Sequence, residues 1–223
     1  MYYEPGGISH NLPFNPLKSC IVPRPIAWIS TVSASGAVNL APFSQCNIVG
    51  WDPPYVMFSA FTRPGGIRKD SVANAEATGE FVFNMATYAL RDAVVATSII
   101  EVSGVNEMEA AGLTVAPARR VAPPLVAESP VNLECKFVRT VELPSTTPGM
   151  FNSLVIGEVV GIHIKDAMLT EGGKLDIERI QPLARMGYLD YAVVREVFEL
   201  RPEGISDRMI EGLSGGAIPL SKG

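Results

Sequence analysis

Residues 23–31 read PRPIAWIST, and residues 39–45 read NLAPFSQ. The first stretch is rich in β-branched and aromatic residues and predicts a strand that runs into a turn at residues 33–36. The second stretch predicts a returning strand that Pro42 breaks, because proline cannot donate to a sheet ladder. A broken strand end leaves backbone N–H groups free, and neighbouring hydroxyl and amide side chains can join them around an anion. The hairpin therefore predicts a phosphate site beside Ser44 and Gln45.

The composition is that of a folded chain with a sizeable core, since 47% of the 223 residues are apolar and 18% are charged. The net charge of −5 argues against a nucleic-acid partner. No apolar run is long enough to span a membrane, and the N-terminus lacks a signal-peptide pattern. Cys20, Cys46 and Cys135 are widely spaced and form no CxxC pair, so we expect reduced thiols in a cytoplasmic protein.

Alternation of apolar and polar residues predicts most of the strands. Between residues 133 and 143, one face holds Leu133, Cys135, Phe137, Val141 and Leu143, and the other holds Glu134, Lys136, Thr140 and Glu142. Further strands are predicted at Ile26–Val32, Val56–Phe61, Glu80–Met85, Leu154–Ile164 and Ala192–Leu200. Because few crossover helices separate them, these strands favour an antiparallel barrel over a doubly wound parallel sheet.

The expected helices are short. They are predicted at residues 70–78, 88–97 and 106–112, the first capped by Asp70 or Ser71 and ended by Gly79. The proline- and alanine-rich residues 113–131 predict a long surface excursion, and the tail beyond Pro202 predicts a loosely held arm. With no repeat and no linker, we expect one domain over residues 1–223, its core at about residues 15–200 between two arms.

Lys69-Asp70-Ser71 lies at a predicted helix start, where unpaired N–H groups and the helix dipole favour an anion. A lysine charge and a serine hydroxyl at this position could bind a phosphate, and Arg63 and Arg68 are further cations nearby in the sequence. The alternative, which spacing alone favours, is that Asp70 or Ser71 only caps the helix while Lys69 is solvated.

Several other chemistries are argued against. The chain has no GxSxG elbow, no suggestive Cys–His pair and no GxGxxG dinucleotide fingerprint. His163 and Asp166 are three positions apart, so in a strand their side chains point to opposite faces, and no metal site is expected.

Further motifs follow the hairpin in order. They are Asp52-Pro53-Pro54 with Val56-Met57-Phe58-Ser59, Lys69-Asp70-Ser71, residues 78–84 (TGEFVFN), residues 128–135 (ESPVNLEC), Gly157-Glu158-Val159-Val160 and residues 181–185 (QPLAR). Together with the hairpin they resemble the flavin reductase-like proteins over about residues 15–200. The resemblance implies a mainly β fold, an antiparallel split β-barrel (the FMN-binding split barrel) with a few short peripheral helices.

The resemblance also implies FMN as the cofactor. In relatives, the Lys-Asp-Ser segment lies close to the FMN phosphate, and the end of the first strand lies beside the flavin. The expected FMN contacts are Ser30, Thr31, Pro42, Phe43, Ser44, Gln45, Asn47, Ser59, Lys69, Asp70, Ser71 and Arg185. Ser30 and Thr31 can equally be ordinary strand residues, and Trp28 is expected in the core rather than on the flavin. Because the flavin carries the hydride chemistry, no catalytic acid or base is expected.

The activity implied is that of an NAD(P)H:flavin oxidoreductase, and a separate monooxygenase is a partner to which it would supply reduced flavin. The chain is also expected to form a homodimer, because Leu154–Ile164 is apolar on more than one face and because relatives pair beside the flavin. Two alternatives stay open: a flavoredoxin-like FMN electron carrier, and a non-enzymatic flavin-binding module. The sequence does not choose between NADH and NADPH.

Two stretches depart from the family pattern. Many relatives have Arg-Leu-Gly-Gly where this chain has Arg185-Met186-Gly187-Tyr188, and Tyr188 is expected to restrict access to the flavin. The Asp-Glu-Phe of relatives appears as Asn106-Glu107-Met108, a change expected to affect mainly a surface helix.

Overall fold

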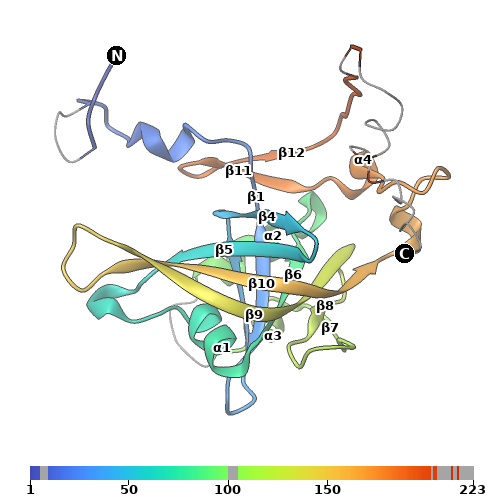
Figure 1. Cartoon of the computed structure of the whole chain (residues 1–223), viewed down its shortest axis with the longest axis horizontal. Helices are drawn as coiled ribbons and strands as arrows, with labels where there is room; N and C mark the ends of the chain where they lie inside the picture. Colours follow the sequence, from blue (N-terminus) through green and yellow to red (C-terminus); the bar gives the residue numbers. More distant parts are fainter. Residues whose placement is uncertain (6–9, 100–104, 202, 205–211, 213–214, 216–223) are drawn as a thin grey trace, which may run out of the picture.

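The computed structural model describes residues 1–5, 10–99, 105–201, 203–204, 212 and 215. Its main feature is a sheet of seven antiparallel strands in the order β3-β2-β6-β9-β10-β5-β4 (Figure 1). In that order the strands are Val38–Phe43, Ala27–Val32, Glu80–Met85, Val131–Pro144, Phe151–Ile164, Pro54–Phe61 and Cys46–Trp51. The expected antiparallel split barrel is therefore confirmed.

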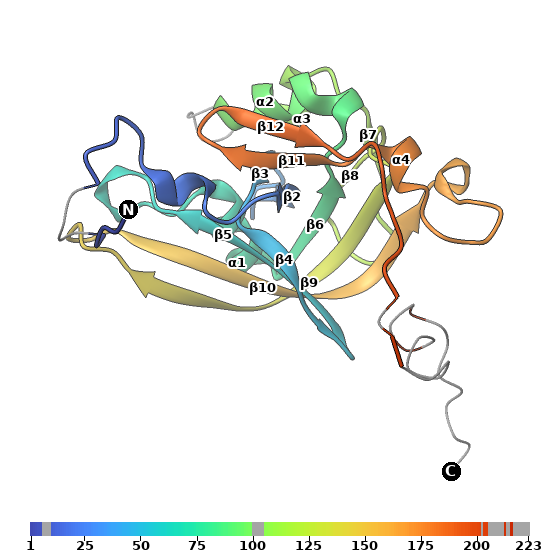
Figure 2. The same cartoon turned by 90° about the horizontal axis from the view of Figure 1, so that it is seen from above.

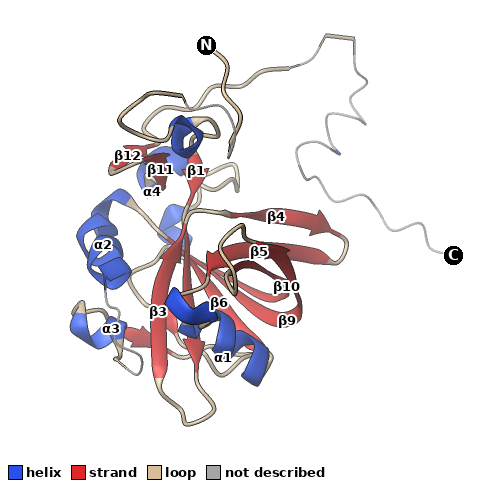
Figure 3. Cartoon of the chain, turned by 90° about the vertical axis from the view of Figure 1, so that its left-hand side faces the viewer, coloured by secondary structure: helices blue, strands red, loops and turns tan. Residues whose placement is uncertain are grey.

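The sheet curves from β3 round to β4, and these two edge strands follow one another in the chain (Figure 3). Phe43 of β3 packs on Phe58 of β5 with ring centroids 5.0 Å apart, and Phe58 meets Phe81 of β6 at 5.4 Å. These contacts cross the inside of the sheet, so apolar packing holds the curl where no ladder joins β3 to β4. Ser44 and Gln45 alone connect the two edges, which places them at the split.

The inside of the curl is closed by α1 (Asp70–Thr78), whose Val72 and Ala75 are buried in the same core as Phe81. The helix ends as predicted, because Gly79 adopts φ 76° and donates its N–H to the Ala75 carbonyl. Space inside is tight: a Cβ on Gly157 of β10 would lie 2.4 Å from two ring carbons of Phe81.

The outer face of β2 is buried as well. Trp28 packs among Leu40, Val94 and Met108 in a second core, and its indole N–H donates to Thr97 at 2.9 Å. The prediction that Trp28 belongs to the core is confirmed. Because both faces of β2 are covered, every one of its residues except Val32 is buried.

The remaining elements surround this sheet (Figure 2). A small antiparallel sheet has the order β1-β11-β12, with strands Arg24–Pro25, Leu183–Gly187 and Asp190–Val193, and β7 (Val115–Ala116) pairs with β8 (Leu125–Val126). The α-helices are α2 (Arg91–Ile99), α3 (Glu107–Ala110) and α4 (Ile177–Ile180), and the 3-10 helices are η1 (Pro16–Ser19), η2 (Pro64–Gly66), η3 (Tyr88–Leu90) and η4 (Asp166–Met168). None of the helices in the described ranges has the length and apolar character needed to cross a bilayer.

Two strand predictions were wrong in extent. β3 is not broken at Pro42 but continues to Phe43, because β3 is an edge strand and its proline need not donate to a second neighbour. The strand predicted at Ala192–Leu200 ends at Val193, since residues 194–200 pair with no other strand. The tail prediction beyond Pro202 lies mostly outside the described residues.

Glu134 lies on the polar face predicted for residues 133–143, but it does not face solvent. Its side chain is fully buried and accepts N–H groups from Arg119 (2.9 Å), Arg120 (2.5 Å) and Val121 (3.1 Å), together with His163 Nε2 at 2.5 Å. Burial alone would raise the pKa of Glu134, but the bonds from His163 and the backbone hold it below its ordinary value. This carboxylate fastens the 119–121 loop to β9.

Two segments predicted at the surface are partly buried. Residues 123–126 of the 113–131 excursion are buried, and Val126 donates its N–H to Asn84 of β6. In the third helix, Glu107 and Met108 are 4% and 0% exposed. The departure from the family pattern at residues 106–108 therefore lies in the core rather than on a surface helix.

Candidate functional site

The start of α1 is a cationic point beside β3. Lys69 is the N-cap, has an extended backbone and is exposed, and its ammonium group has no partner among the described residues. Arg63 instead makes a two-point ion pair with Asp70, Nη1–Oδ1 3.2 Å and Nη2–Oδ2 3.1 Å. Because Arg63 is neutralised by Asp70, Lys69 and the helix N-terminus supply the attraction for an anion.

Arg68, the other arginine near Lys69 in the sequence, has partners outside the candidate site. It pairs with Glu76 at 3.2 Å and with Glu142 at 2.5 Å, and it stacks on Phe151. We therefore leave it out of the candidate site.

A buried polar network lies under the start of α1. Asn39 of β3 donates to Ser71 at 2.9 Å and to Thr31 at 3.4 Å, and Asn74 of α1 donates to the same Thr31 hydroxyl at 3.1 Å. Thr31 and Asn39 are direct cross-strand partners. The network thus fixes Ser71 and the first turn of α1 relative to the end of the β2–β3 hairpin.

A small cavity of about 50 Å³ opens at this point, along the free edge of β3. Of the predicted site residues it brings together Pro42, Phe43, Lys69, Asp70 and Ser71, with Asn39, Arg63 and Glu107 around them. This volume suits a group of a few heavy atoms and is too small for a ring system.

Glu107 is the one carboxylate besides Asp70 among the residues that line the small cavity. Its Oε2 accepts the backbone N–H of Leu40 at 2.9 Å, and burial raises its pKa. Glu107 therefore ties α3 to the edge of β3 beside the cavity.

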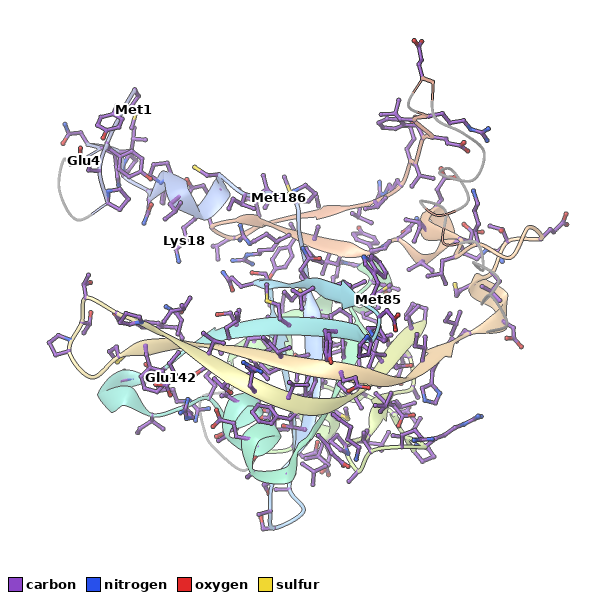
Figure 4. The ribbon with its side chains drawn as sticks, viewed as in Figure 1. Met1, Glu4, Lys18, Met85, Glu142 and Met186 are labelled. Atoms are coloured by element: carbon purple, nitrogen blue, oxygen red, sulfur yellow. The ribbon has the colours of Figure 1, made fainter. Side chains whose placement is uncertain are left out.

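A second cavity, of about 570 Å³, is lined by Ser44, the residue that follows Phe43 in the chain. One part of its lining comes from the β3–β4 connection, the start of β4 and β5, namely Ser44, Gln45, Cys46, Asn47 and Met57. The other part comes from the segment that runs from the N-cap of η1 to β1, namely Asn15, Leu17, Lys18, Ile21, Pro23, Arg24 and Pro25. Lys18 points from η1 toward the sheet (Figure 4).

Arg24 is held rigidly in the wall of this larger cavity. Its Nη1 donates to the carbonyls of Lys18 (2.8 Å) and Ile21 (2.9 Å). Its Nε is buried and has no hydrogen-bond partner within the described part of the chain. A buried donor without an acceptor is costly, so an acceptor on a ligand would satisfy it.

The thiol of Cys46 also lines the larger cavity. It donates to the Pro25 carbonyl at 3.3 Å, and burial raises its pKa to about 11. The group is therefore a neutral thiol near pH 7 and not an activated nucleophile. All three cysteines are free, as predicted, and the described residues contain no cluster of three or more metal-ligating side chains.

Four of the predicted site residues line neither cavity, namely Ser30, Thr31, Ser59 and Arg185. Ser30 is fully buried and bonds to the Pro124 carbonyl (2.6 Å) and to Asn84 (3.1 Å). Ser59 donates its backbone N–H to Gln45, next to the larger cavity. Arg185 faces Tyr191 and bonds to the Tyr188 carbonyl, although its backbone pairs with Arg24.

Tyr188 lies in the turn between β11 and β12 with φ 46°, and its ring packs on Phe14 at 5.5 Å. Gly187 beside it must be glycine, because a Cβ there would meet Ser19 Oγ at 2.2 Å. The Ser19 hydroxyl also donates to the Met186 carbonyl at 2.8 Å, and Met186 lies beside η1 in Figure 4. The turn thus holds η1, which forms one wall of the larger cavity.

Asn39, Glu107 and Arg24 were missed as site residues. Asn39 could have been found, because it alternates with Ala41 and Phe43 and so faces the same side of the hairpin. Glu107 and Arg24 carried no such pattern. Glu107 is placed at the site by its bond to Leu40 of β3, and Arg24 is placed by its bond to the carbonyl of Lys18 in η1.

The family model described as "Flavin reductase like domain" matches residues 19–184. The chain is 33% identical to the uncharacterized protein BH2278 of Halalkalibacterium halodurans over 92% of this chain and 98% of that one. It is 32% identical to the uncharacterized protein YwrF of Bacillus subtilis, over 82% and 90% of the two chains.

Among solved structures, nitrilotriacetate monooxygenase component B from Bacillus cereus superposes with a TM-score of 0.82 at 30% identity, over 90% of this chain and 98% of that one. Flavoredoxin of Desulfovibrio vulgaris (Miyazaki F) gives 0.70 at 19% identity over 82% and 93%, a likeness of fold. Since the family model covers most of the chain and close relatives align almost end to end, the chain belongs to the flavin reductase-like domain family.

Proposed function

We propose that this protein binds FMN along residues 42–47 and acts as an NAD(P)H-dependent flavin reductase that supplies reduced flavin to a separate monooxygenase. The observation that carries the proposal is a pair of neighbouring cavities of unequal size. Phe43 lines the cavity of about 50 Å³, and Ser44, the next residue, lines the cavity of about 570 Å³. FMN has a compact anionic phosphate and a broad ring system, and this pair of cavities fits both.

The smaller cavity suits the phosphate. Lys69 adds an unpaired positive charge, the first turn of α1 adds N–H groups, and Ser71 adds a hydroxyl held by Asn39. Thr31 contributes indirectly, since it positions Asn39 from below. We leave Ser30 out of the proposed contacts because its hydroxyl is bonded in the interior.

The larger cavity suits the ring system. Ser44, Gln45 and Asn47 offer polar groups at the split of the barrel, and Arg24 offers its unsatisfied Nε donor. Bound flavin would supply the hydride-accepting chemistry, and these residues would bind and orient it. The η1 wall, held by the β11–β12 turn, would exclude water from one side.

The activity and partner are supported by the kind of relative that the chain has. The Bacillus cereus protein, 30% identical over 90% of this chain, is named as one component of a monooxygenase. A reductase that works for a separate oxygenase is consistent with that name. Three free thiols fit a reducing compartment, and we propose the cytoplasm.

We also propose a homodimer that covers the edge of β4. In this edge strand Ile48, Val49 and Trp51 are 46%, 53% and 81% exposed, and Ile21 on the facing wall of the larger cavity is 74% exposed. An apolar, unpaired sheet edge beside a cavity favours a protein partner. Light scattering should give twice the chain mass of 23.9 kDa at micromolar concentration. A mass of one chain with FMN still bound would contradict the dimer.

The experiment that tests the function compares FMN, FAD and riboflavin as acceptors during NADH and NADPH oxidation by the purified protein. Riboflavin lacks the phosphate, so it should be used at a kcat/KM one to two decades below that of FMN, the factor that about 1.5–3 kcal/mol of charge-assisted bonding supplies. An equal kcat/KM for FMN and riboflavin would show that the protein does not bind the phosphate at the proposed site. Flavin binding without oxidation of either nicotinamide would favour a carrier or a binding module.

A further inference from the structure

A third cavity lies against β11 and β12 of the small sheet, and its lining residues differ from those of the two flavin-site cavities. It has a volume of about 270 Å³ and lies between the start of α2 and strands β11 and β12. Tyr88, Arg91 and Val95 form one side, and Leu183, Tyr191 and Val193 form the other. Because the strand order is β1-β11-β12, β11 separates this cavity from β1, whose Arg24 lines the larger flavin-site cavity.

The size and floor of this cavity favour a single ring. A volume of about 270 Å³ is larger than the roughly 150 Å³ cavity that accepts benzene and just below the range of about 300–1,000 Å³ for drug-sized ligands. Leu183, Val193 and Val95 supply apolar surface, and Tyr88 and Tyr191 add aromatic side chains to the lining. FMN and dinucleotides are too large for it.

The rim of the cavity favours an anion. The guanidinium carbon of Arg91 lies 4.4 Å from the ring centroid of Tyr88, and that of Arg195 lies 5.3 Å from the same ring. A guanidinium stacked on a ring keeps its N–H donors in its own plane, where they can meet a carboxylate. Arg91 uses one donor on the Tyr88 carbonyl, whereas the side chain of Arg195 has no acceptor among the described residues.

One acidic group faces this rim and only partly offsets it. Asp92 lies 3.7 Å from Arg91 Nη2, but its side chain is 89% exposed and turned to solvent. On the opposite side, Arg185 stacks on Tyr191 at 4.4 Å and adds a third positive charge. The cavity is therefore apolar inside and positive at its mouth.

We propose that this cavity is a binding site for a small aromatic carboxylate, with the ring on Leu183, Val95 and Val193 and the carboxylate on Arg195 and Arg91. The binding claim itself does not depend on the proposed flavin chemistry.

The test is titration calorimetry of the full chain with 4-hydroxybenzoate and with its neutral analogue 4-hydroxybenzamide. The acid should bind at least fivefold more tightly than the amide. Arg195→Gln should remove that difference, and Val95→Trp, which fills the cavity from the partly exposed face of α2, should abolish binding. Arg201→Gln, an exposed arginine outside the cavity, serves as the matched control and should behave like the wild type.

Four results would overturn the proposal. The first is that the acid does not bind at concentrations up to about 10 mM, which corresponds to a binding free energy of about 3 kcal/mol or less. The second is that the acid and the amide bind equally tightly, and the third is that the acid binds both variants with unchanged affinity. Displacement of the acid by FMN would likewise overturn it, because it would place the compound in the flavin site. Failure of flavin reductase activity alone would leave the calorimetric result standing, so the two proposals fail separately.

Discussion

The substitution Lys69→Ala isolates the proposed phosphate contact. Lys69 is exposed, is the N-cap of α1 without a side-chain capping bond, and has no partner among the described residues. Its removal should therefore leave the free energy of unfolding nearly unchanged. Arg63→Ala would be a poorer probe, because it would strip Asp70 of its two-point ion pair and disturb the helix start.

The expected loss of FMN affinity follows from the kind of bond removed. A hydrogen bond between a cation and a phosphate contributes about 1.5–3 kcal/mol, which corresponds to one to two decades in Kd. Because Lys69 remains solvent-exposed, we expect the lower part of that range, and salt should weaken binding to the wild type more than to the variant.

The assay is quenching of flavin fluorescence, with Lys174→Ala as the matched control. Lys174 is an exposed lysine in the loop between η4 and α4, away from both flavin-site cavities. Riboflavin should bind equally to the wild type and to Lys69→Ala. If FMN affinity does not change in Lys69→Ala, or if riboflavin affinity falls as much, Lys69 does not bind the phosphate and the orientation of the ligand is wrong.

Three more predictions concern the barrel and the η1 wall. Gly157→Ala should destabilise the fold by about 1–3 kcal/mol in urea unfolding, because its Cβ would meet Phe81, whereas Gly172→Ala in a roomier turn should be nearly neutral. Since the pKa of Glu134 is lowered in the folded state, the stability that its carboxylate contributes should be present above about pH 4.3 and lost as the pH falls below it, and Glu134→Gln should flatten that dependence in thermal melts at pH 3–7. Tyr188→Gly should speed flavin reduction in stopped-flow measurements without changing FMN affinity, because it loosens the η1 wall; an unchanged rate would show that the wall does not limit access.

The local pattern was enough to predict much of the fold. The strand at Glu80–Met85 and the Gly79 stop of α1 follow from neighbouring residues, and both appear at the expected places. The burial of Glu134 was not predictable, because its period-two position says which face it occupies but not what covers that face. The backbone N–H groups that cover it come from residues 119–121, whose packing no local pattern encodes.

The candidate site was predictable in part for the same reason. Residues 42–45 and 69–71 each carry a local mark, a proline in a strand and a helix start, and the structure brings several of them to the small cavity. The split of the site into two cavities was not predictable. It depends on how η1 is held over the barrel by Gly187 and Tyr188, far along the chain.

The most direct test of the central claim is anaerobic titration of the FMN-loaded wild-type protein with NADH and, separately, with NADPH. We expect at least one of them to bleach the visible absorption of the bound flavin with one equivalent of nicotinamide per flavin, since each hydride carries two electrons. A flavin that stays bound and oxidised through excess NADH and excess NADPH would contradict the reductase function.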